Sequence, residues 1–309
     1  MDLSIAIVSW NVKELLADCL ASVYASLEGN ATEYQVLVVD NASSDGSVDM
    51  VHERFPQARL MANADNKGFA AANNQAMVKS RGRYVVLLNP DTVLRDNALG
   101  TMRRFMDDTP SVGMAGPRLV YGNGSFQHSA FGFPSLAQVF FDFFPVHYRL
   151  LESRLNGRYP RSLYASGRPF AIDHPLGACM VVRREVIEQV GRLDEQFFMY
   201  CEEVDWAMRM RRAGWGVYCV PAAEVVHYAG QSTRQFRDEM FVALWRSRFR
   251  LFAKHYGTLY NWAVRRIVRA GLRYEEGRAR RQAEADLIPE EELVGRLAAY
   301  QRVRQMTYG

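Results

Sequence analysis

The chain has 309 residues, enough for a large buried core in one large domain or two smaller ones. Hydrophobic residues make up 49% and charged residues 23%, close to the average of soluble globular proteins. The sequence excludes a membrane-spanning helix, because no run approaches the roughly 18 consecutive apolar residues that one requires, and residues 1–11 lack the features of a signal peptide.

The net charge of +4 is unevenly distributed. Residues 246–281 contain 11 Lys/Arg and 2 Asp/Glu, whereas the rest of the chain contains 27 basic and 32 acidic residues. A basic segment on a mildly acidic body indicates an anionic partner surface. The four cysteines show no CxxC spacing, so we expect buried free thiols and a reducing, cytoplasmic setting.

The first half of the chain alternates strands and helices. Apolar runs predict strands at Ser4–Ser9, Tyr34–Val39 and Tyr84–Leu88, and helical periodicity predicts helices at Lys13–Tyr24, Ser47–Phe55 and Gly68–Lys79. This alternation is typical of an α/β, Rossmann-like parallel sheet, in which ligands bind at the carboxyl ends of the strands.

The second half is less regular. We expect strands at Val112–Ala115, Ala178–Arg183 and Val217–Val220, a hairpin turn at Gly122-Asn123-Gly124, and a helix at Glu203–Ala213. Residues 130–172 are rich in aromatics and predict an irregular excursion over the site. The last seventy residues show helical spacing, with Phe241 to Tyr256 on one stripe and Arg265, Arg269 and Arg273 on one helix face.

Polar residues follow each predicted strand of the first half. They are Ser9-Trp10-Asn11, Asp40-Asn41 and Asn89-Pro90-Asp91. Asp40 could accept hydrogen bonds from a pyrimidine ring N–H or from ribose hydroxyls. The competing interpretation is a strand-to-helix turn that Ser47 caps.

Two further segments suit an anionic ligand. Gly68 begins a helix whose N-terminal N–H groups suit an anion, with Lys67 beside it, although a glycine-punctuated loop would give the same pattern. Asp91 follows a buried strand and could bridge a hard divalent cation to a diphosphate, which the cation would stabilise as a leaving group. His227, after Val225-Val226, is the expected partner of Asp91 on the metal, although a lone histidine after a strand is more often structural.

An acid cluster follows the aromatic run Phe197-Phe198-Met199-Tyr200. Glu202, Glu203 and Asp205 begin a helix, where acids are also favourable simply because of the helix dipole. A glutamate near a cleft could take the proton of an acceptor hydroxyl, and aromatic neighbours would raise its pKa by desolvation.

Taken together and in order, these segments resemble the family 2 inverting glycosyltransferases of GT-A fold, and within them the bacterial rhamnosyltransferase-like members. Seven stretches between about residues 3 and 260 carry the resemblance: Val8–Asn11, Val39–Ser47, Asn66–Ala70, Leu88–Asp91, Gly177–Met180, Phe197–Asp205 and His227–Ser232. The resemblance implies a GT-A domain over 1–238, with a nucleotide-sugar half at 1–110 and an acceptor and catalytic-base half at 111–238. A basic helical extension at 239–309 would follow.

The resemblance also implies roles for individual residues. Nucleotide-sugar binding would involve Ser9, Asn11, Asp40, Asn41, Lys67, Gly68, Asn89 and Asp91, and a Mn²⁺ or Mg²⁺ ion would sit on Asp91 and His227. Gly177, Ala178 and Asp205 would line the acceptor or sugar pocket. Asn89 departs from the Asp-x-Asp form, and Glu202-Glu203 departs from the usual Glu-Asp, which makes Glu203 the expected base and Glu202 its competitor.

The implied reaction moves a sugar, with rhamnose as a subgroup guess, from a nucleoside-diphosphate-sugar to a glycan or lipid-linked glycan during cell-surface polysaccharide synthesis. The alternative is a non-catalytic binding or scaffold subunit of the same fold. A dinucleotide-dependent oxidoreductase is disfavoured because Ser9–Glu14 contains no glycine, and nucleic-acid binding because the expected cleft is acidic.

The basic tail leaves two interpretations open. Residues 246–281 could lie on an anionic membrane with aromatics inward and arginines toward lipid phosphate, or they could pack on the catalytic domain or on a second subunit of a homo-oligomer. The first interpretation predicts a cytoplasmic protein held peripherally at the inner face of the membrane.

Overall fold

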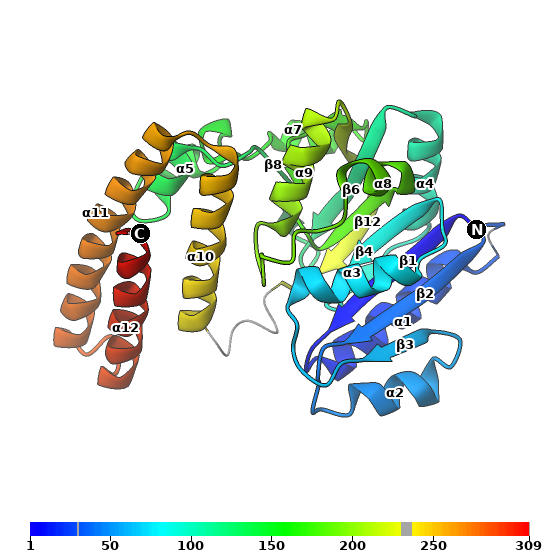
Figure 1. The fold of residues 1–309 in the computed structure, drawn as a ribbon, viewed down its shortest axis with the longest axis horizontal. Helices are drawn as coiled ribbons and strands as arrows, with labels where there is room; N and C mark the ends of the chain where they lie inside the picture. The colour runs from blue at the N-terminus through cyan, green and yellow to red at the C-terminus, as the bar shows by residue number, and fades with distance from the viewer. Residues whose placement is uncertain (30, 230–236, 309) are drawn as a thin grey trace. The chain divides into compact units, whose positions relative to one another are not determined.

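A computed structural model describes residues 1–29, 31–229 and 237–308 (Figure 1). The chain divides into two compact units. The sheet unit comprises Met1–Gly132, Tyr159–Phe198 and Glu202–Ser232, and the helical unit comprises Phe133–Arg158, Met199–Cys201 and Thr233–Gly309. The expected boundary at 238 therefore misses one feature, because residues 133–158 group with the C-terminal helices.

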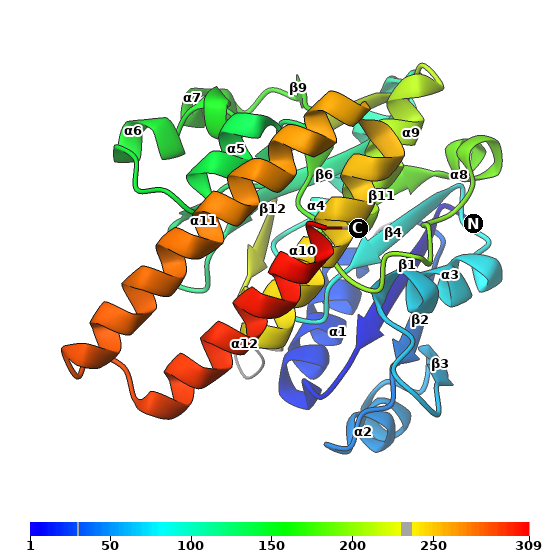
Figure 2. The same cartoon turned by 60° about the vertical axis from the view of Figure 1, so that its left-hand side comes forward.

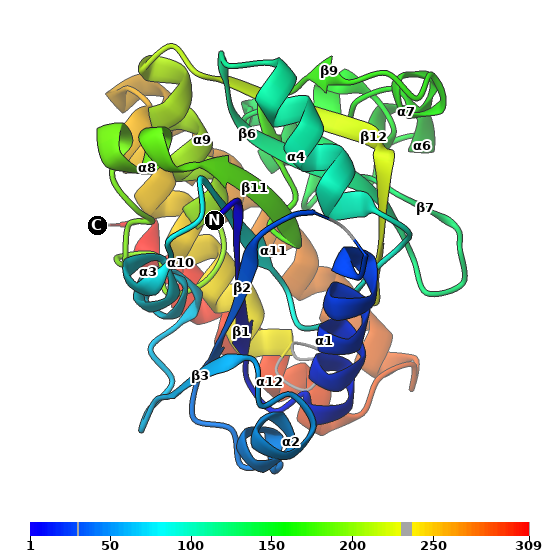
Figure 3. The same ribbon diagram turned by 90° about the vertical axis from the view of Figure 1, so that its right-hand side faces the viewer.

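The first half of the sheet unit alternates strands and helices as the sequence predicts. Its elements are β1 (Leu3–Ser9), α1 (Lys13–Leu27), β2 (Tyr34–Asp40), α2 (Ser47–Arg54), β3 (Arg59–Ala62), α3 (Phe69–Lys79) and β4 (Tyr84–Leu88). Every residue of β1 and β4 is buried, as expected of parallel strands covered on both faces. Figure 3 shows α1 and α3 on opposite sides of β1 and β2.

The rest of the sheet unit completes one mixed sheet and adds a separate two-stranded sheet. Its elements are β5 (Thr92–Leu94), α4 (Ala98–Asp108), β6 (Val112–Val120), β7 (Phe126–Gln127), β8 (Ala130–Phe131), α7 (Arg161–Ala165), β9 (Phe170–Ala171), β10 (His174–Pro175), β11 (Cys179–Arg183), α8 (Arg184–Val190), α9 (Glu202–Arg212) and β12 (Gly216–His227). In the mixed sheet the strand order is β3-β2-β1-β4-β11-β6-β12-β5, and β11 runs antiparallel between β4 and β6. In the two-stranded sheet β8 and β10 pair. The predicted Gly122–Gly124 turn joins β6 to β7.

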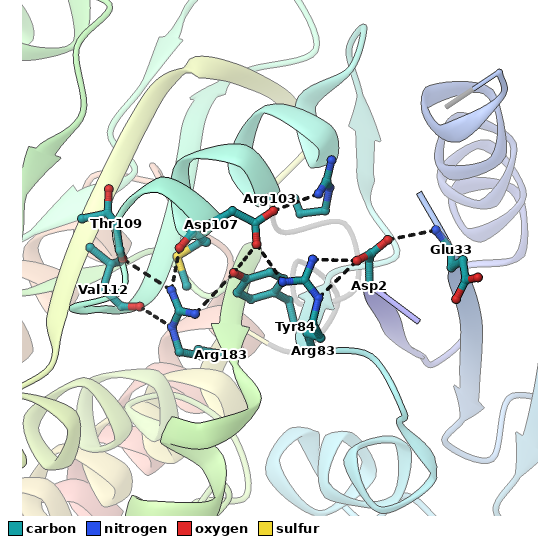
Figure 4. Close-up of polar contacts among 10 residues, drawn as sticks. Asp2, Glu33, Arg83, Tyr84, Arg103, Asp107, Thr109, Val112 and Arg183 are labelled. Atoms are coloured by element: carbon teal, nitrogen blue, oxygen red, sulfur yellow. Dashed lines mark hydrogen bonds and ion pairs between the residues drawn. The ribbon is translucent and has the colours of Figure 1, made fainter. Parts of the chain in front are cut away.

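A polar network holds the amino-terminal end of this sheet together (Figure 4). Asp107 of α4 accepts hydrogen bonds from Arg83, Arg103 and the buried Tyr84 hydroxyl, each at 2.8 Å. Arg183 of β11 donates to the carbonyls of Met106 and Val112. The network joins β4, β11 and α4 at the edge of the sheet where β4 begins and β11 ends.

The helical unit is built around three long helices, α10 (Arg237–His255), α11 (Thr258–Glu284) and α12 (Glu290–Met306), which Figure 2 shows lying alongside one another. The short elements α5 (Leu136–Phe141), α6 (Tyr148–Leu151) and the 3₁₀ turn η1 (Arg154–Asn156) complete it. Phe143 stacks on Trp245 of α10 and fits against Gly271 of α11, where a Cβ would come within 2.2 Å of its ring. Within the described residues, no helix is long and apolar enough to cross a membrane.

Candidate active site

The strand ends of the first half converge at one edge of the sheet. Ser9 pairs with Asp40 in the β1–β2 register, and Ile7 pairs with Leu88 in the β1–β4 register, so Ser9, Asp40 and Asn89 end neighbouring strands. The antiparallel strand β11 brings a fourth segment to the same edge, because the Asn89 N–H donates to the Ala178 carbonyl at 2.9 Å. The predicted donor and acceptor segments therefore meet here.

Asp40 and Ser9, which end β2 and β1 at this edge, each have a buried oxygen with no hydrogen-bond partner among the described residues. Asp40 is 2% exposed, and while its Oδ2 accepts from the Ser43 N–H at 2.9 Å, its Oδ1 is unpaired. The Ser9 hydroxyl is likewise buried and unpaired. Since an unsatisfied buried polar atom costs free energy, these two atoms indicate a place where a ligand completes the hydrogen bonding.

Asn11 and Asn41 form hydrogen bonds with the loops that follow the strands. The Asn11 N–H donates to the Ser43 hydroxyl, and Asn11 Oδ1 accepts from the Ser44 N–H at 2.8 Å. Asn41 Nδ2 donates to Asn66 Oδ1, and Asn41 Oδ1 accepts from Lys67 N–H at 3.0 Å. Both asparagines therefore position the loops at the strand ends, and their direct contact with a nucleotide-sugar stays a prediction.

Gly68 is needed for a close approach of two chain segments. Its φ is +82°, and a Cβ there would lie 2.5 Å from the Phe198 carbonyl oxygen. The Phe69 N–H donates to that same carbonyl at 2.8 Å, and the Gly68 N–H donates to Asn66 Oδ1. Two N–H groups at the start of α3 thus bind the chain itself, which leaves fewer donors for the anion predicted there, while Lys67 forms an ion pair with Asp65.

Asp91 and His227 lie together, as predicted from positions far apart in the sequence. His227 Nε2 is 3.5 Å from Asp91 Oδ1, both side chains are almost fully buried, and the Tyr228 N–H donates to the Asp91 carbonyl. The β5–β12 register, which pairs Thr92 with His227, produces this contact. The imidazole Nδ1 contacts Gln127 at 3.1 Å, which orients the ring with Nε2 toward the carboxylate.

The two adjacent glutamates at the start of α9 have different surroundings. Glu202 is 6% exposed with an unpartnered Oε2, and burial together with the Glu203 charge raises its pKa well above the usual value. Glu203 is only partly buried, and desolvation raises its pKa to about 7. A Cβ on Gly177 would lie 3.8 Å from Glu203 Cγ and Cδ, so Gly177 lies beside this carboxylate.

Asp205 does not lie on a pocket surface, contrary to the expectation from the sequence. Its side chain is fully buried and pairs with Arg209 at 2.9 Å. Arg209 in turn donates to the carbonyls of Val190 and Arg192. The structure therefore places Asp205 inside the packing between α8 and α9, where it holds the segment that precedes the acid cluster.

Several positioning residues escape the sequence analysis. Asn74 binds the 193–195 segment through Leu193 and Glu195, and Gln127 orients His227. Their only sequence signal is a polar residue within an apolar helix or strand, which names no partner. The four cysteines are buried and free, as predicted.

Comparison with known proteins agrees with this geometry. Residues 4–191 match the family model described as Glycosyl transferase family 2. The chain is 28% identical over 256 residues to N-acetylglucosaminyl-diphospho-decaprenol L-rhamnosyltransferase of Mycobacterium tuberculosis, covering 77% of this chain and 80% of that one. It is 26% identical to the rhamnosyltransferase WbbL of Escherichia coli K12, covering 77% and 89%.

A solved structure supports the fold. The mannosyltransferase PcManGT from Pyrobaculum calidifontis, solved with GDP-Man and Mn²⁺, superposes with a TM-score of 0.59 at 17% identity, covering 99% of this chain and 86% of that one. The fold is thus the predicted GT-A arrangement of a mainly parallel sheet flanked by helices with C-terminal helices. Since the family model spans more than half of the sequence, the chain is a member of glycosyl transferase family 2.

Proposed function

We propose that the chain transfers a sugar, with rhamnose the first candidate, from a nucleoside-diphosphate donor to a hydroxyl of a lipid-linked glycan, with inversion at the anomeric carbon. One observation carries the proposal: Asp40, Asn89, Gly177 and the Asp91–His227 pair all stand at the carboxyl edge of one sheet, with Glu203 beside Gly177. The relatives named as rhamnosyltransferases, one with a decaprenol-linked acceptor, support the choice of sugar and acceptor.

The donor nucleotide would satisfy the unpaired atoms at the ends of β1 and β2. Asp40 Oδ1 would accept a hydrogen bond from the base or the ribose, and the Ser9 hydroxyl would donate or accept beside it. The loops that Asn11 and Asn41 hold in place keep these atoms fixed before the donor arrives.

The residues present fit a divalent cation. Among the residues that the structure describes, no group of three or more His, Cys, Asp and Glu side chains is placed to hold one. Asp91 and His227 would supply two ligands, and Asn89 Oδ1, which is buried and unpaired, is an additional oxygen close by in the chain. Mn²⁺ or Mg²⁺ sites that bind substrate phosphates commonly take few protein ligands, and such an ion would offset the charge of the departing diphosphate.

Glu203 is the proposed base. With a pKa of about 7 Glu203 is ready to take a proton near neutral pH. It is also the less buried of the two glutamates, and burial together with the Glu203 charge raises the pKa of Glu202 as well. The acceptor hydroxyl gives its proton to Glu203, its oxygen bonds to the anomeric carbon, and the bond from that carbon to the donor phosphate oxygen breaks. This single displacement leaves no sugar on the protein.

The test combines donor binding with turnover. Thermal shift with nucleoside diphosphates and their sugars, with Mn²⁺ or Mg²⁺, should reveal stabilisation by one donor class. Glu203→Gln should retain that shift and lose transfer by about 10²–10⁴-fold, while Glu185→Gln on the exposed face of α8 should change neither. Full turnover in Glu203→Gln contradicts the base assignment, and no stabilisation by any donor contradicts the transferase proposal.

We also propose that the chain works at an anionic membrane surface through residues 246–281, because a lipid-linked acceptor is held at one. Peripheral attachment at the inner face of the membrane follows from that proposal.

A further inference from the structure

We propose that one face of α11, centred on Leu259 and Trp262, inserts into an anionic lipid surface. This inference rests on the proposed function only for its purpose, since it concerns the helical unit and not the site in the sheet unit. The proposed lipid contact is smaller than the whole basic segment 246–281. It consists of the apolar pair Leu259 and Trp262 and the basic residues around that pair.

The first observation is charge. Residues 240–274 contain eight Lys/Arg and no Asp or Glu. An acidic stretch begins only at the last residue of α11: residues 284–292, at the turn to α12, contain five acids and no base, whereas α11 itself stays basic as far as Arg281. Since α11 has 27 residues, the first turn of the helix, with Leu259, is about 40 Å along the helix axis from this acidic turn. Figure 2 shows the turn from α11 to α12, where these acidic residues lie.

The second observation is exposed apolar area within the basic residues 240–274. Leu259 is 78% exposed and Trp262 is 56% exposed, and they lie one turn apart on α11. The buried side of the helix carries Val264, Val268 and Leu272. Leu259 and Trp262 thus stand on the outer face, where they bury little against their own chain.

Positive charge continues along that outer face. Arg266 lies over the Trp262 ring at 5.4 Å, and Arg273 is exposed two turns further on. On α10, Arg246, Arg250 and Lys254 are exposed at four-residue spacing. Tryptophan and leucine flanked by arginine and lysine are the composition of helices that lie in a membrane interface.

Two of the arginines expected to face lipid phosphate instead form hydrogen bonds within the helical unit. Arg269 donates to the Thr307 carbonyl at 2.9 Å and Arg265 donates to the same oxygen, so both bind the end of α12. The surface available to lipid is therefore smaller than the basic segment as a whole. The charge complementarity that selects an anionic lipid surface rests on Arg246, Arg266 and Arg273, which are exposed.

The experiment is vesicle flotation of the full chain. We expect it to float with vesicles of phosphatidylcholine and phosphatidylglycerol in equal parts, to float weakly with phosphatidylcholine alone, and to detach as salt is raised. Arg273→Ala should lower vesicle affinity about five-fold. Leu259→Glu should remove most of the binding and leave the fold intact, because an acid in the first turn of a helix is favourable.

The matched control is Leu287→Glu. Leu287 is 72% exposed, almost as much as Leu259, but it lies among the acidic residues 284–292, in the turn between α11 and α12. Its replacement should leave flotation unchanged, and an equal loss in both variants overturns the proposal. A chain that fails to float and forms a dimer that Leu259→Glu dissociates would assign this face to self-association instead.

Donor binding separates this proposal from the proposed function. Thermal stabilisation by a nucleoside diphosphate is measured without vesicles and should be the same in Leu259→Glu as in the unchanged chain. Donor binding without flotation overturns the membrane anchor alone, whereas flotation without binding of any donor overturns the transferase proposal alone.

Discussion

Two consecutive glutamates at the start of α9 show how position changes the chemistry of one residue type. Glu203 is partly exposed beside Gly177, and Glu202 points into the packing with an unpaired oxygen. Burial raises both pKa values, that of Glu203 to about 7, and the Glu203 charge raises that of Glu202 further. Transfer by a base with this pKa should increase as the pH rises through about 7, because the carboxylate is the active form.

The pH–rate profile of kcat/KM measures this dependence. Glu202→Gln should keep a rising limb near pH 7, and Glu203→Gln should lose it together with the activity. A rising limb that survives in Glu203→Gln and disappears in Glu202→Gln would assign the base to Glu202.

Glu202 should also reduce stability at neutral pH. Its folded-state pKa lies well above the unfolded value of about 4.5, so the folded state is progressively destabilised as the pH rises above that unfolded value. Glu202→Gln should therefore raise the Tm at pH 8 and change it little at pH 4. A lower Tm at pH 8 would show that the charge of Glu202 is compensated in the folded chain.

Gly68 permits a contact that any other residue would block. Gly68→Ala should destabilise the chain by more than the ~1–3 kcal/mol of backbone strain at its φ of +82° and ψ of 171°, because its Cβ would also meet the Phe198 carbonyl. Gly124→Ala is the control, since Gly124 has nearly the same φ, +79°, with no atom within 4 Å of the added carbon. Denaturant unfolding gives both values, and equal losses would show that the Phe198 contact is easily relieved.

At the scale of elements, the Asp107 network joins α4 to β4. Its neighbours Arg83 and Tyr84 hold the pKa of Asp107 below the usual value against the opposing effect of burial, and hydrogen bonding from Arg83 does the same for Asp2. This stability is present above the unfolded pKa of about 3.8 and is lost as the pH falls through the lower folded values.

Asp107→Asn should lower the free energy of unfolding by about 1–3 kcal/mol at pH 7, because the variant replaces charge-assisted hydrogen bonds. It should also weaken the decline of the Tm below pH 4. The adjacent and exposed Asp108→Asn should leave both unchanged. A Tm curve of Asp107→Asn that parallels the unchanged chain in acid would show that other groups cause the acid loss.

Strands with continuous apolar runs were predictable from the sequence, and those defined by long-range pairing were not. β4 needs only its own five buried residues, and its bounds agree with the prediction. β5 has three residues, and its strand conformation depends on β12, more than a hundred residues away. β3 is a partly exposed edge strand with little apolar pattern, and α4 and α8 were also not predicted.

The proximity of Asp91 and His227 was predictable from the sequence, but the contacts of other candidate residues were not. The Asp91–His227 contact follows from polar residues at strand ends, which a parallel sheet brings together. The engagement of Asn41 with Asn66 and Lys67 depends on loop paths that no local pattern encodes. The burial of Asp205 against Arg209 likewise could not be told from an acid at a helix start.

At the scale of the whole molecule, the helical unit contains an excursion from the middle of the sequence. Tyr256 and Tyr260 stack at 4.2 Å and both donate to the Pro134 carbonyl, while Phe143 packs on Trp245. The C-terminal helices are therefore not a removable tail, because residues 133–158 would lose the surface on which they pack.

A chain ended after Ser232 should accordingly be poorly soluble and unfold at a lower temperature. A second truncation that also replaces 133–158 with a glycine-serine linker should recover solubility, since it removes the exposed apolar residues. Expression yield and light scattering compare the two, and a soluble, monodisperse simple truncation would show that the excursion folds without its helices.

The buried thiols give this protein a built-in measure of its own opening. Cys19 contacts the Asn89 carbonyl and the Thr92 hydroxyl directly under the Asp91 turn, and burial raises its pKa to about 12. Cys179 and Cys219 are equally protected. A thiol reagent can therefore label these side chains only when the surrounding structure opens locally. The rate at which Cys19 is labelled measures how often the segment around Asp91 opens.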